Sequence, residues 1–147
     1  MPIKKEMKAF STYHLIKSED LNHHGTLYAG RSAEWFVEAG FIAASALLNP
    51  HHVICLKIHG MYFSSPVRLG QSVCYTSRIA YTGKSSLVAH IGVSLINSDE
   101  VLVEGFITFV HVDTNTVATP HGVEIVATNE HDLFIQNKAK NLKKMIC

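Results

Sequence analysis

The residues with the clearest chemical potential lie in a polar loop, residues 20–30, that leads into a long apolar helix. Asn22 and His24 can donate or accept hydrogen bonds, and the small pair Ala29 and Gly30 follows them. The first N–H groups of a helix have no partner inside it, and the positive end of its dipole lies beside them. Such groups can stabilise an oxygen atom that gains negative charge. The loop and helix start therefore suit an oxyanion-binding site, although small residues there can also serve packing alone.

Acidic residues on the same helix are the second chemical feature. The helix expected at 31–48 is apolar around most of its circumference, so other structure should wrap it. Glu34 and Glu38 share one stripe of this helix with Arg31. A carboxylate on a mostly buried helix should have a raised pKa unless it is paired, which suits a general base. The alternative is an ion pair of Arg31 with either glutamate, or a contact across a dimer.

The surrounding segments alternate between strand and helix patterns. A β-rich run at 7–17 precedes the loop, and Asn49–Pro50 ends the helix because proline cannot continue one. Later segments alternate apolar and polar residues with a period of two, and tight turns join the last of them into an antiparallel meander. These strands are expected at 53–63, 71–81, 86–96 and 101–112, and a C-terminal helix at about 129–145.

This order predicts an α+β fold in which a strongly curved antiparallel sheet wraps around the long central helix. The chain is expected to form a single domain, 1–147, with its core at about 7–115. A curved sheet covers only part of a helix. The exposed edge strand and helix end therefore favour a homodimer in which sheets pair edge to edge.

Composition restricts the possible functions. The chain has 147 residues, of which 47% are hydrophobic and 17% charged, as in a compact globular protein. A net charge of +1 without a basic stripe argues against nucleic-acid binding. The cysteines Cys55, Cys74 and Cys147 are odd in number and lack metal-ligand spacing, which indicates a reducing compartment and no metal site. Without a secretory signal or an apolar run of about 20 residues, a cytoplasmic protein with no membrane span is expected.

Three motifs, in order, resemble those of the hotdog-fold acyl-CoA thioesterases, and most closely the cytosolic acyl-CoA hydrolase branch. The resemblance covers about residues 10–115. The motifs are Asp20-x-Asn22-x-x-Gly25-x-x-x-Ala29-Gly30-x4-Trp35-x-x-Glu38-Ala39-Gly40, then Phe63-x-x-Pro66-Val67-x-x-Gly70, then Gly83-Lys84-Ser85-Ser86. The resemblance implies a hotdog fold and hydrolysis of acyl-CoA to free acid and coenzyme A. It also implies active sites at a homodimer interface within a tetramer or hexamer, and coenzyme A as part of the substrate with no separate cofactor.

The resemblance also implies roles for individual residues. Asn22 would position the substrate or a water molecule, and the N–H of Ala29 would face the thioester carbonyl. The family places a carboxylate at position 37, as general base or nucleophile, but this chain has Val37. Glu38 is rotated by about 100° from that position on a helix, and Glu34 by about 60°. We expect Glu38, Asn22 and Ala29 to be the catalytic residues.

Other residues are expected to bind the substrate. His59 can reach toward the helix and pair with Glu38 to form a base, or it can be an ordinary hydrogen-bonded strand histidine. The turn at 83–86 can contact coenzyme A or serve only as a hairpin turn. The substrate-binding residues predicted in this way are His24, Tyr28, Gly30, His59, Lys84, Ser85 and Ser86.

The missing carboxylate leaves more than one function open. The first is an acyl-CoA thioesterase. The second is a non-hydrolytic hotdog module that binds acyl-CoA or acyl-carrier ligands, which Val37 favours. The third is a hotdog dehydratase or hydratase that uses His59.

Overall fold

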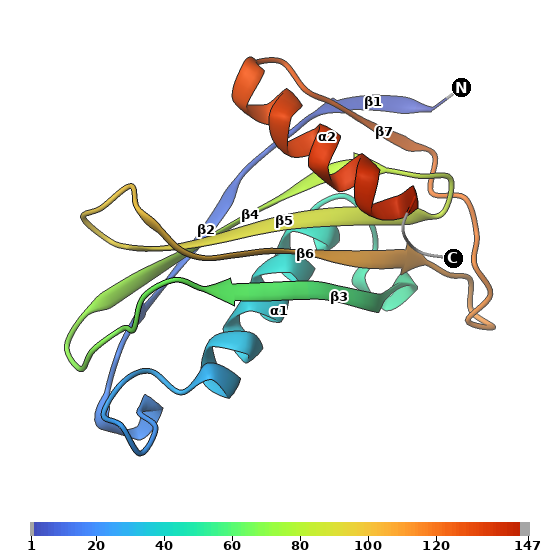
Figure 1. Cartoon of the computed structure of the whole chain (residues 1–147). Coiled ribbons are helices and arrows are strands. Elements are labelled where there is room, and N and C mark those ends of the chain that lie inside the picture. The colour runs from blue at the N-terminus through green and yellow to red at the C-terminus, as the bar shows by residue number, and fades with distance from the viewer. Residues whose placement is uncertain (1, 145–147) are drawn as a thin grey trace.

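The computed structural model describes residues 2–144, and a curved antiparallel sheet with a long helix along one face dominates it (Figure 1). The sheet has five strands in the order β2-β4-β5-β6-β3, and a separate parallel pair joins β1 to β7. The elements are β1 (Ile3–Glu6), β2 (Phe10–Leu15), α1 (Ala29–Ser45), β3 (Val53–Phe63), β4 (Ser72–Thr82), β5 (Ser86–Leu95), β6 (Val101–His111), β7 (Val123–Val126) and α2 (Glu130–Lys144), with short 3-10 turns at Ser18–Asp20 and Pro50–His52.

The predicted fold class is therefore confirmed. The meander β4-β5-β6 has the expected neighbours, and β3 has the expected bounds. The central helix begins at Ala29 and ends at Ser45, earlier at both ends than expected. The strands β1 and β7 were not predicted, and position 145 of the expected C-terminal helix lies outside the described residues. No helix among residues 2–144 is long and apolar enough to cross a membrane.

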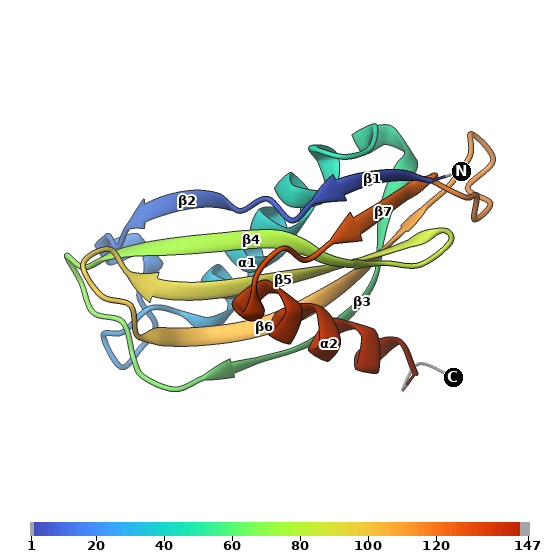
Figure 2. The ribbon, with the colours of Figure 1, turned by 90° about the horizontal axis from the view of Figure 1, so that it is seen from above.

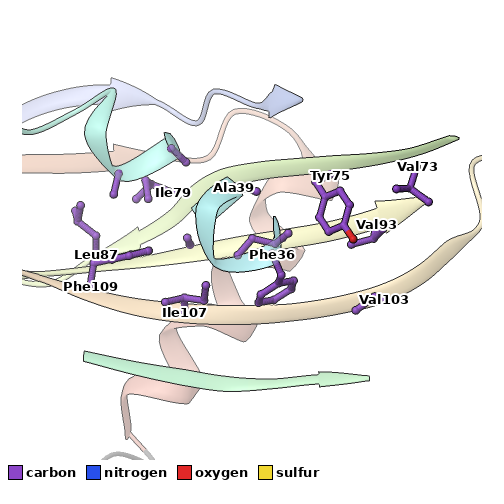
Figure 3. Packing of buried hydrophobic residues seen from close by; sticks show 14 of the residues in the cluster. Phe36, Ala39, Val73, Tyr75, Ile79, Leu87, Val93, Val103, Ile107 and Phe109 are labelled. Atoms are coloured by element: carbon purple, nitrogen blue, oxygen red, sulfur yellow. The ribbon is translucent and has the colours of Figure 1, made fainter. Parts of the chain in front are cut away.

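The core lies between α1 and the concave face of the sheet. Phe36, Ala39 and Ala43 recur at helical spacing and are almost fully buried. Figure 3 shows Phe36 and Ala39 against side chains that rise from β4, β5 and β6. Gly40 permits this close approach, because a Cβ atom there would lie 3.1 Å from the side chain of Ile107.

The opposite face of α1 is not covered within one chain. Glu34 and Glu38 are exposed, and the apolar side chains of Val37 and Phe41 are only half-buried. This agrees with the expectation that a curved sheet covers only part of the helix. The uncovered apolar stripe requires another cover.

The edge strand β3 is also incompletely covered. It pairs with β6 on one side only, and it carries large apolar side chains at high exposure. Leu56 is 59% exposed and Tyr62 is 68% exposed. A long apolar edge strand is a template for pairing with another chain.

The second helix covers part of the convex face of the sheet, on the side opposite α1 (Figure 2). Ile135 and Ala139 of α2 pack against Ala80 of β4 and Val88 of β5. An ion pair of 3.2 Å between Arg78 and Asp132 connects the same elements.

Candidate functional site

A cavity of about 320 Å³ lies at the start of α1. It is bounded by the polar loop, by the first turn of the helix and by the chain that follows β3, with side chains of β5 and β6 at its base. Its lining residues are Asn22, Thr26, Leu27, Ala29, Ser32, Phe63, Ser64, Ser65, Pro66, Val67, Val93 and Val103. Two of the predicted catalytic residues, Asn22 and Ala29, therefore share one cavity.

Asn22 shapes the loop that forms one wall of this cavity. Its side-chain oxygen accepts hydrogen bonds from the backbone N–H groups of His24 and Thr26, at 2.9 and 3.2 Å. Its Nδ2 donates to the Thr26 hydroxyl at 3.2 Å, and Gly25 completes the tight loop with a φ of 77°. These bonds occupy the oxygen of Asn22. The amide nitrogen carries two hydrogens, so one N–H is still available to a ligand.

The first turn of α1 presents free backbone donors. The N–H groups of Arg31 and Ser32 both donate to the carbonyl oxygen of Tyr28, at 3.0 and 3.1 Å. Within the described chain, the N–H groups of Ala29 and Gly30 meet no acceptor, as is usual at the first positions of a helix. Because Ala29 also lines the cavity, its N–H is well placed to meet an electron-rich ligand oxygen.

The predicted residues Gly30 and Tyr28 pack against each other rather than line the cavity. A Cβ atom at position 30 would lie 2.5 Å from a ring carbon of Tyr28. Glycine at this position therefore allows the tyrosine ring to fold against the helix start. Tyr28 itself is 57% exposed.

A buried hydroxyl pair was not predicted from the sequence. Ser32 is only 2% exposed, and its Oγ lies 2.9 Å from the hydroxyl oxygen of Tyr75 on β4. Burial raises the pKa of Tyr75 to about 12. Ser32 lines the cavity together with Ala29. The sequence signal that could have found it is a serine at helical spacing from Phe36, on a face that is otherwise apolar.

Comparison with known proteins identifies the family. The sequence profile of the thioesterase superfamily matches residues 24–104, which include the end of the polar loop, the helix and most of the sheet. The chain belongs to the thioesterase superfamily. No curated protein matches the sequence.

Solved structures of acyl-CoA thioesterases share the hotdog fold of this thioesterase-family chain. An acyl-CoA hydrolase from Staphylococcus aureus, in complex with butyryl coenzyme A, coenzyme A and coenzyme A disulfide, has a TM-score of 0.86 at 18% identity, with 97% of this chain and 87% of that chain covered. An acyl-CoA hydrolase from Bacillus cereus has a TM-score of 0.82 at 21% identity, with coverage of 94% and 85%. A hexameric thioesterase from Yersinia pestis has a TM-score of 0.68 at 26% identity, with coverage of 74% and 91%.

The carboxylates of α1 do not reach the cavity of this thioesterase-family chain. Glu38 is exposed, so the premise that it sits on a buried helix face is wrong within one chain. The predicted pair of Arg31 with Glu34 is present but long, at 3.9 Å. Arg31 lies closer to Asp20, whose side chain is 5% exposed, at 3.3 Å. Arg31 thus joins the start of the helix to the loop.

His59 lies on the other face of the sheet. Its Nε2 is 2.6 Å from the hydroxyl of Thr108, which alternates along β6 with the core residues Ile107 and Phe109. The expectation that His59 faces the helix is therefore wrong. Burial, and then the nearby Lys57, lower the pKa of His59.

The remaining predicted ligands lie away from the cavity within one chain. Lys84 and Ser85 form the β4–β5 turn, and Ser86 opens β5, whereas the cavity is beside Val93 near the other end of that strand. His24 is exposed, and its ring centroid lies 3.9 Å from that of His23. Among residues 2–144, no group of three or more His, Cys, Asp or Glu is placed to hold a metal ion.

Proposed function

We propose that this protein is a thioester hydrolase that cleaves acyl-CoA to a free acid and coenzyme A. The observation that carries the proposal is the unpaired N–H of Ala29 at the mouth of a cavity that Asn22 also lines. Thioester hydrolysis needs donors for the developing oxyanion, and backbone N–H groups at a helix start suit this task. The family of the chain and its likeness to acyl-CoA hydrolases support the same reaction.

The proposed reaction is the attack of water on the thioester carbonyl carbon. A base takes one proton from the water as the new C–O bond forms, and the carbonyl electron pair moves to the oxygen. The N–H of Ala29 stabilises that oxygen, and the free N–H of Asn22 orients the water or the carbonyl. The carbonyl then re-forms and the C–S bond breaks. Coenzyme A leaves as a thiolate, so it enters as part of the substrate and the reaction needs no separate cofactor.

The base is proposed to come from the assembled homodimer. The residues that line the cavity within one chain include no Asp, Glu or His among those the structure describes. Glu38 lies on the uncovered face of α1, next to the half-buried Val37, where a second copy would pack. The apolar edge of β3 supports such a dimer. Residues 84–86 lie away from the cavity of their own chain, so they would contact coenzyme A only at the cavity of a second copy. We expect the dimers to form a tetramer or a hexamer. The thioesterase from Yersinia pestis is a hexamer.

The free thiols Cys55 and Cys74 suit a cytoplasmic enzyme of lipid metabolism, and this location is part of the proposal.

Release of coenzyme A from a panel of acyl-CoAs of increasing chain length tests the proposal. We expect turnover by the wild type and a loss of about 100-fold or more in Glu38→Gln, because general-base catalysis contributes roughly 10²–10⁴. Glu34→Gln, which changes an exposed carboxylate on the same helix, is the matched control and should retain activity. Normal turnover by Glu38→Gln would remove Glu38 from the mechanism. Failure of folded wild type to cleave any chain length would contradict the hydrolase.

A non-catalytic module that binds acyl-CoA or acyl-carrier ligands is the second candidate. The observation that favours it is the absence of a base among the described cavity residues, together with Val37 on α1. Such a module would be stabilised against heat by an acyl-CoA that it leaves intact. Thermal unfolding with acyl-CoA, followed by assay of the ligand for free thiol, separates the two candidates.

A further inference from the structure

The pair Ser32 and Tyr75 is a buried polar contact in an otherwise apolar core. Ser32 is 2% exposed and Tyr75 is 0% exposed, and their oxygens lie 2.9 Å apart. The ring of Tyr75 is fixed edge-on to His14 and Trp35, at centroid distances of 5.7 and 6.0 Å. Burying hydroxyl groups costs free energy unless they are hydrogen-bonded. Packing alone would be served equally well by alanine and phenylalanine.

The direction of the hydrogen bond follows from the partners available. Tyr75 stays protonated at neutral pH, and Ser32 is the acceptor that its hydroxyl meets among the described residues. If Ser32 donated to Tyr75, the phenolic proton would be buried without a partner. Tyr75 therefore donates to Ser32. The carbonyl of Tyr28, one turn before Ser32, already accepts two N–H groups, so the serine proton is free for another acceptor.

The free proton of Ser32 is directed toward the cavity. Ser32 lines that cavity together with Ala29, which lies one turn earlier on the same face of α1. Side chains on a helix lean toward its N-terminus. The hydroxyl of Ser32 therefore lies over the turn that begins at Ala29, and both residues line the same cavity.

We propose that the Ser32 hydroxyl, held in place by Tyr75, is a second donor to the substrate carbonyl oxygen beside the N–H of Ala29. This inference rests on the proposed function for the identity of the ligand, an acyl thioester. Ser32 keeps its proton and forms no covalent bond to the substrate. Its hydrogen bond strengthens as water attacks and the carbonyl electron pair moves to the oxygen. Tyr75 is a positioning residue, because it acts through Ser32.

Kinetics of three variants test the role of Ser32. We expect Ser32→Ala to lower kcat by about 100-fold, as for other oxyanion donors, and to raise KM by at most about tenfold, because the bond is stronger in the transition state than in the bound substrate. Tyr75→Phe should lower kcat less, and the double variant should be no slower than Ser32→Ala, because the two residues act as one unit. Ser77→Ala is the matched control: Ser77 is a buried serine on the strand of Tyr75 that does not line the cavity. An unchanged kcat in folded Ser32→Ala, with turnover by the wild type, would overturn the proposal.

Binding of paired analogues tests the same contact without hydrolysis. The probes are an S-(2-oxoalkyl) coenzyme A, which keeps a carbonyl, and the S-alkyl coenzyme A of equal length, which lacks one. We expect Ser32→Ala to weaken the ketone by about three- to tenfold, the range of one net hydrogen bond, and to leave the alkyl analogue unchanged. A merely structural role would change both affinities equally and would overturn the proposal. The ratio of the two affinities is measured without turnover. It would therefore still test the contact of Ser32 with a carbonyl if the protein did not hydrolyse acyl-CoA.

Discussion

The two faces of strand β4 carry buried polar residues of different kinds. On the concave face, the neutral hydroxyl of Tyr75 contacts Ser32, and Ser32 lines a cavity. On the convex face, Arg78 forms an ion pair of 3.2 Å with Asp132 of α2. The first contact leaves a proton free beside a ligand-sized space, whereas the second neutralises two charges under a helix. A buried polar group is therefore a functional candidate when it keeps a spare donor beside a cavity.

The largest expected effect is on the concave side, at the first residue of α1. Ala29→Pro should lower kcat by roughly 10²–10³-fold, because proline removes the N–H that faces the carbonyl. Proline is well tolerated at the first helical position, and Tyr28 before it already has the extended conformation that proline requires, with a ψ of 127°. The measurement is kcat for acyl-CoA hydrolysis, with the midpoint of thermal unfolding as a check of the fold.

Ala29→Gly is the control for this substitution, since it keeps the N–H and should keep most of the activity. A kcat that survives Ala29→Pro would show that the oxyanion is bound elsewhere.

On the convex side we expect an effect on stability alone. Asp132→Ala should lower the free energy of unfolding by about 3 kcal/mol, because it leaves the mostly buried charge of Arg78 unpaired. The same substitution removes the bonds of Asp132 to Asn129 at the start of α2. Urea denaturation measures the change, and the exposed Glu130→Gln in the same turn is the control. A loss of kcat in folded Asp132→Ala would contradict the division of roles between the faces.

The smallest expected effect is a pH dependence of stability on the convex side. Burial lowers the pKa of His90, against the opposing effect of Glu104, while Arg78 and Lys138 lower it further. Burial acts to raise the pKa of Glu104, but His90 and Lys138 outweigh it and lower the pKa. Unfolding thus takes up protons at both groups as the pH falls. His90 lowers the stability of the native state below pH 6.5 and Glu104 lowers it below pH 4.5, the ordinary pKa values of the two groups.

His90→Gln should reduce this slope, by at most about 1.4 kcal/mol per pH unit for one titrating group. Urea denaturation at several pH values from about 7.5 to about 5, a range that spans the ordinary pKa of histidine, gives the two slopes. Equal slopes for wild type and variant would assign the pH dependence to other residues, such as His14 and His59, whose pKa values burial also lowers.

Local sequence patterns predicted most of the elements, because the strands alternate apolar and polar residues and the long helix is a sustained apolar run that ends at Asn49–Pro50. The pair of short strands β1 and β7 was missed, since its parallel pairing joins the two ends of the chain and leaves little periodic signal. The prediction that His59 faces the helix was wrong for a specific reason. β3 has register shifts between Cys55 and Lys57 and between Ile58 and Met61, and such bulges break the period of two on which the prediction relied.

The sequence alone determined the fold class, the polar loop around Asn22 and the presence of a long helix after that loop, because these depend on local propensity and on motif spacing. The start of the helix at Ala29, earlier than the expected residue 31, came only from the structure. Only the tertiary structure decided which side chains meet. A helix that is apolar nearly all round does not reveal which face the sheet will cover, so the exposure of Glu38 was not predictable. The contact of Ser32 with Tyr75 joins residues 43 positions apart and arises only when the sheet closes over α1. The site is therefore set by packing between distant segments, which no local pattern encodes.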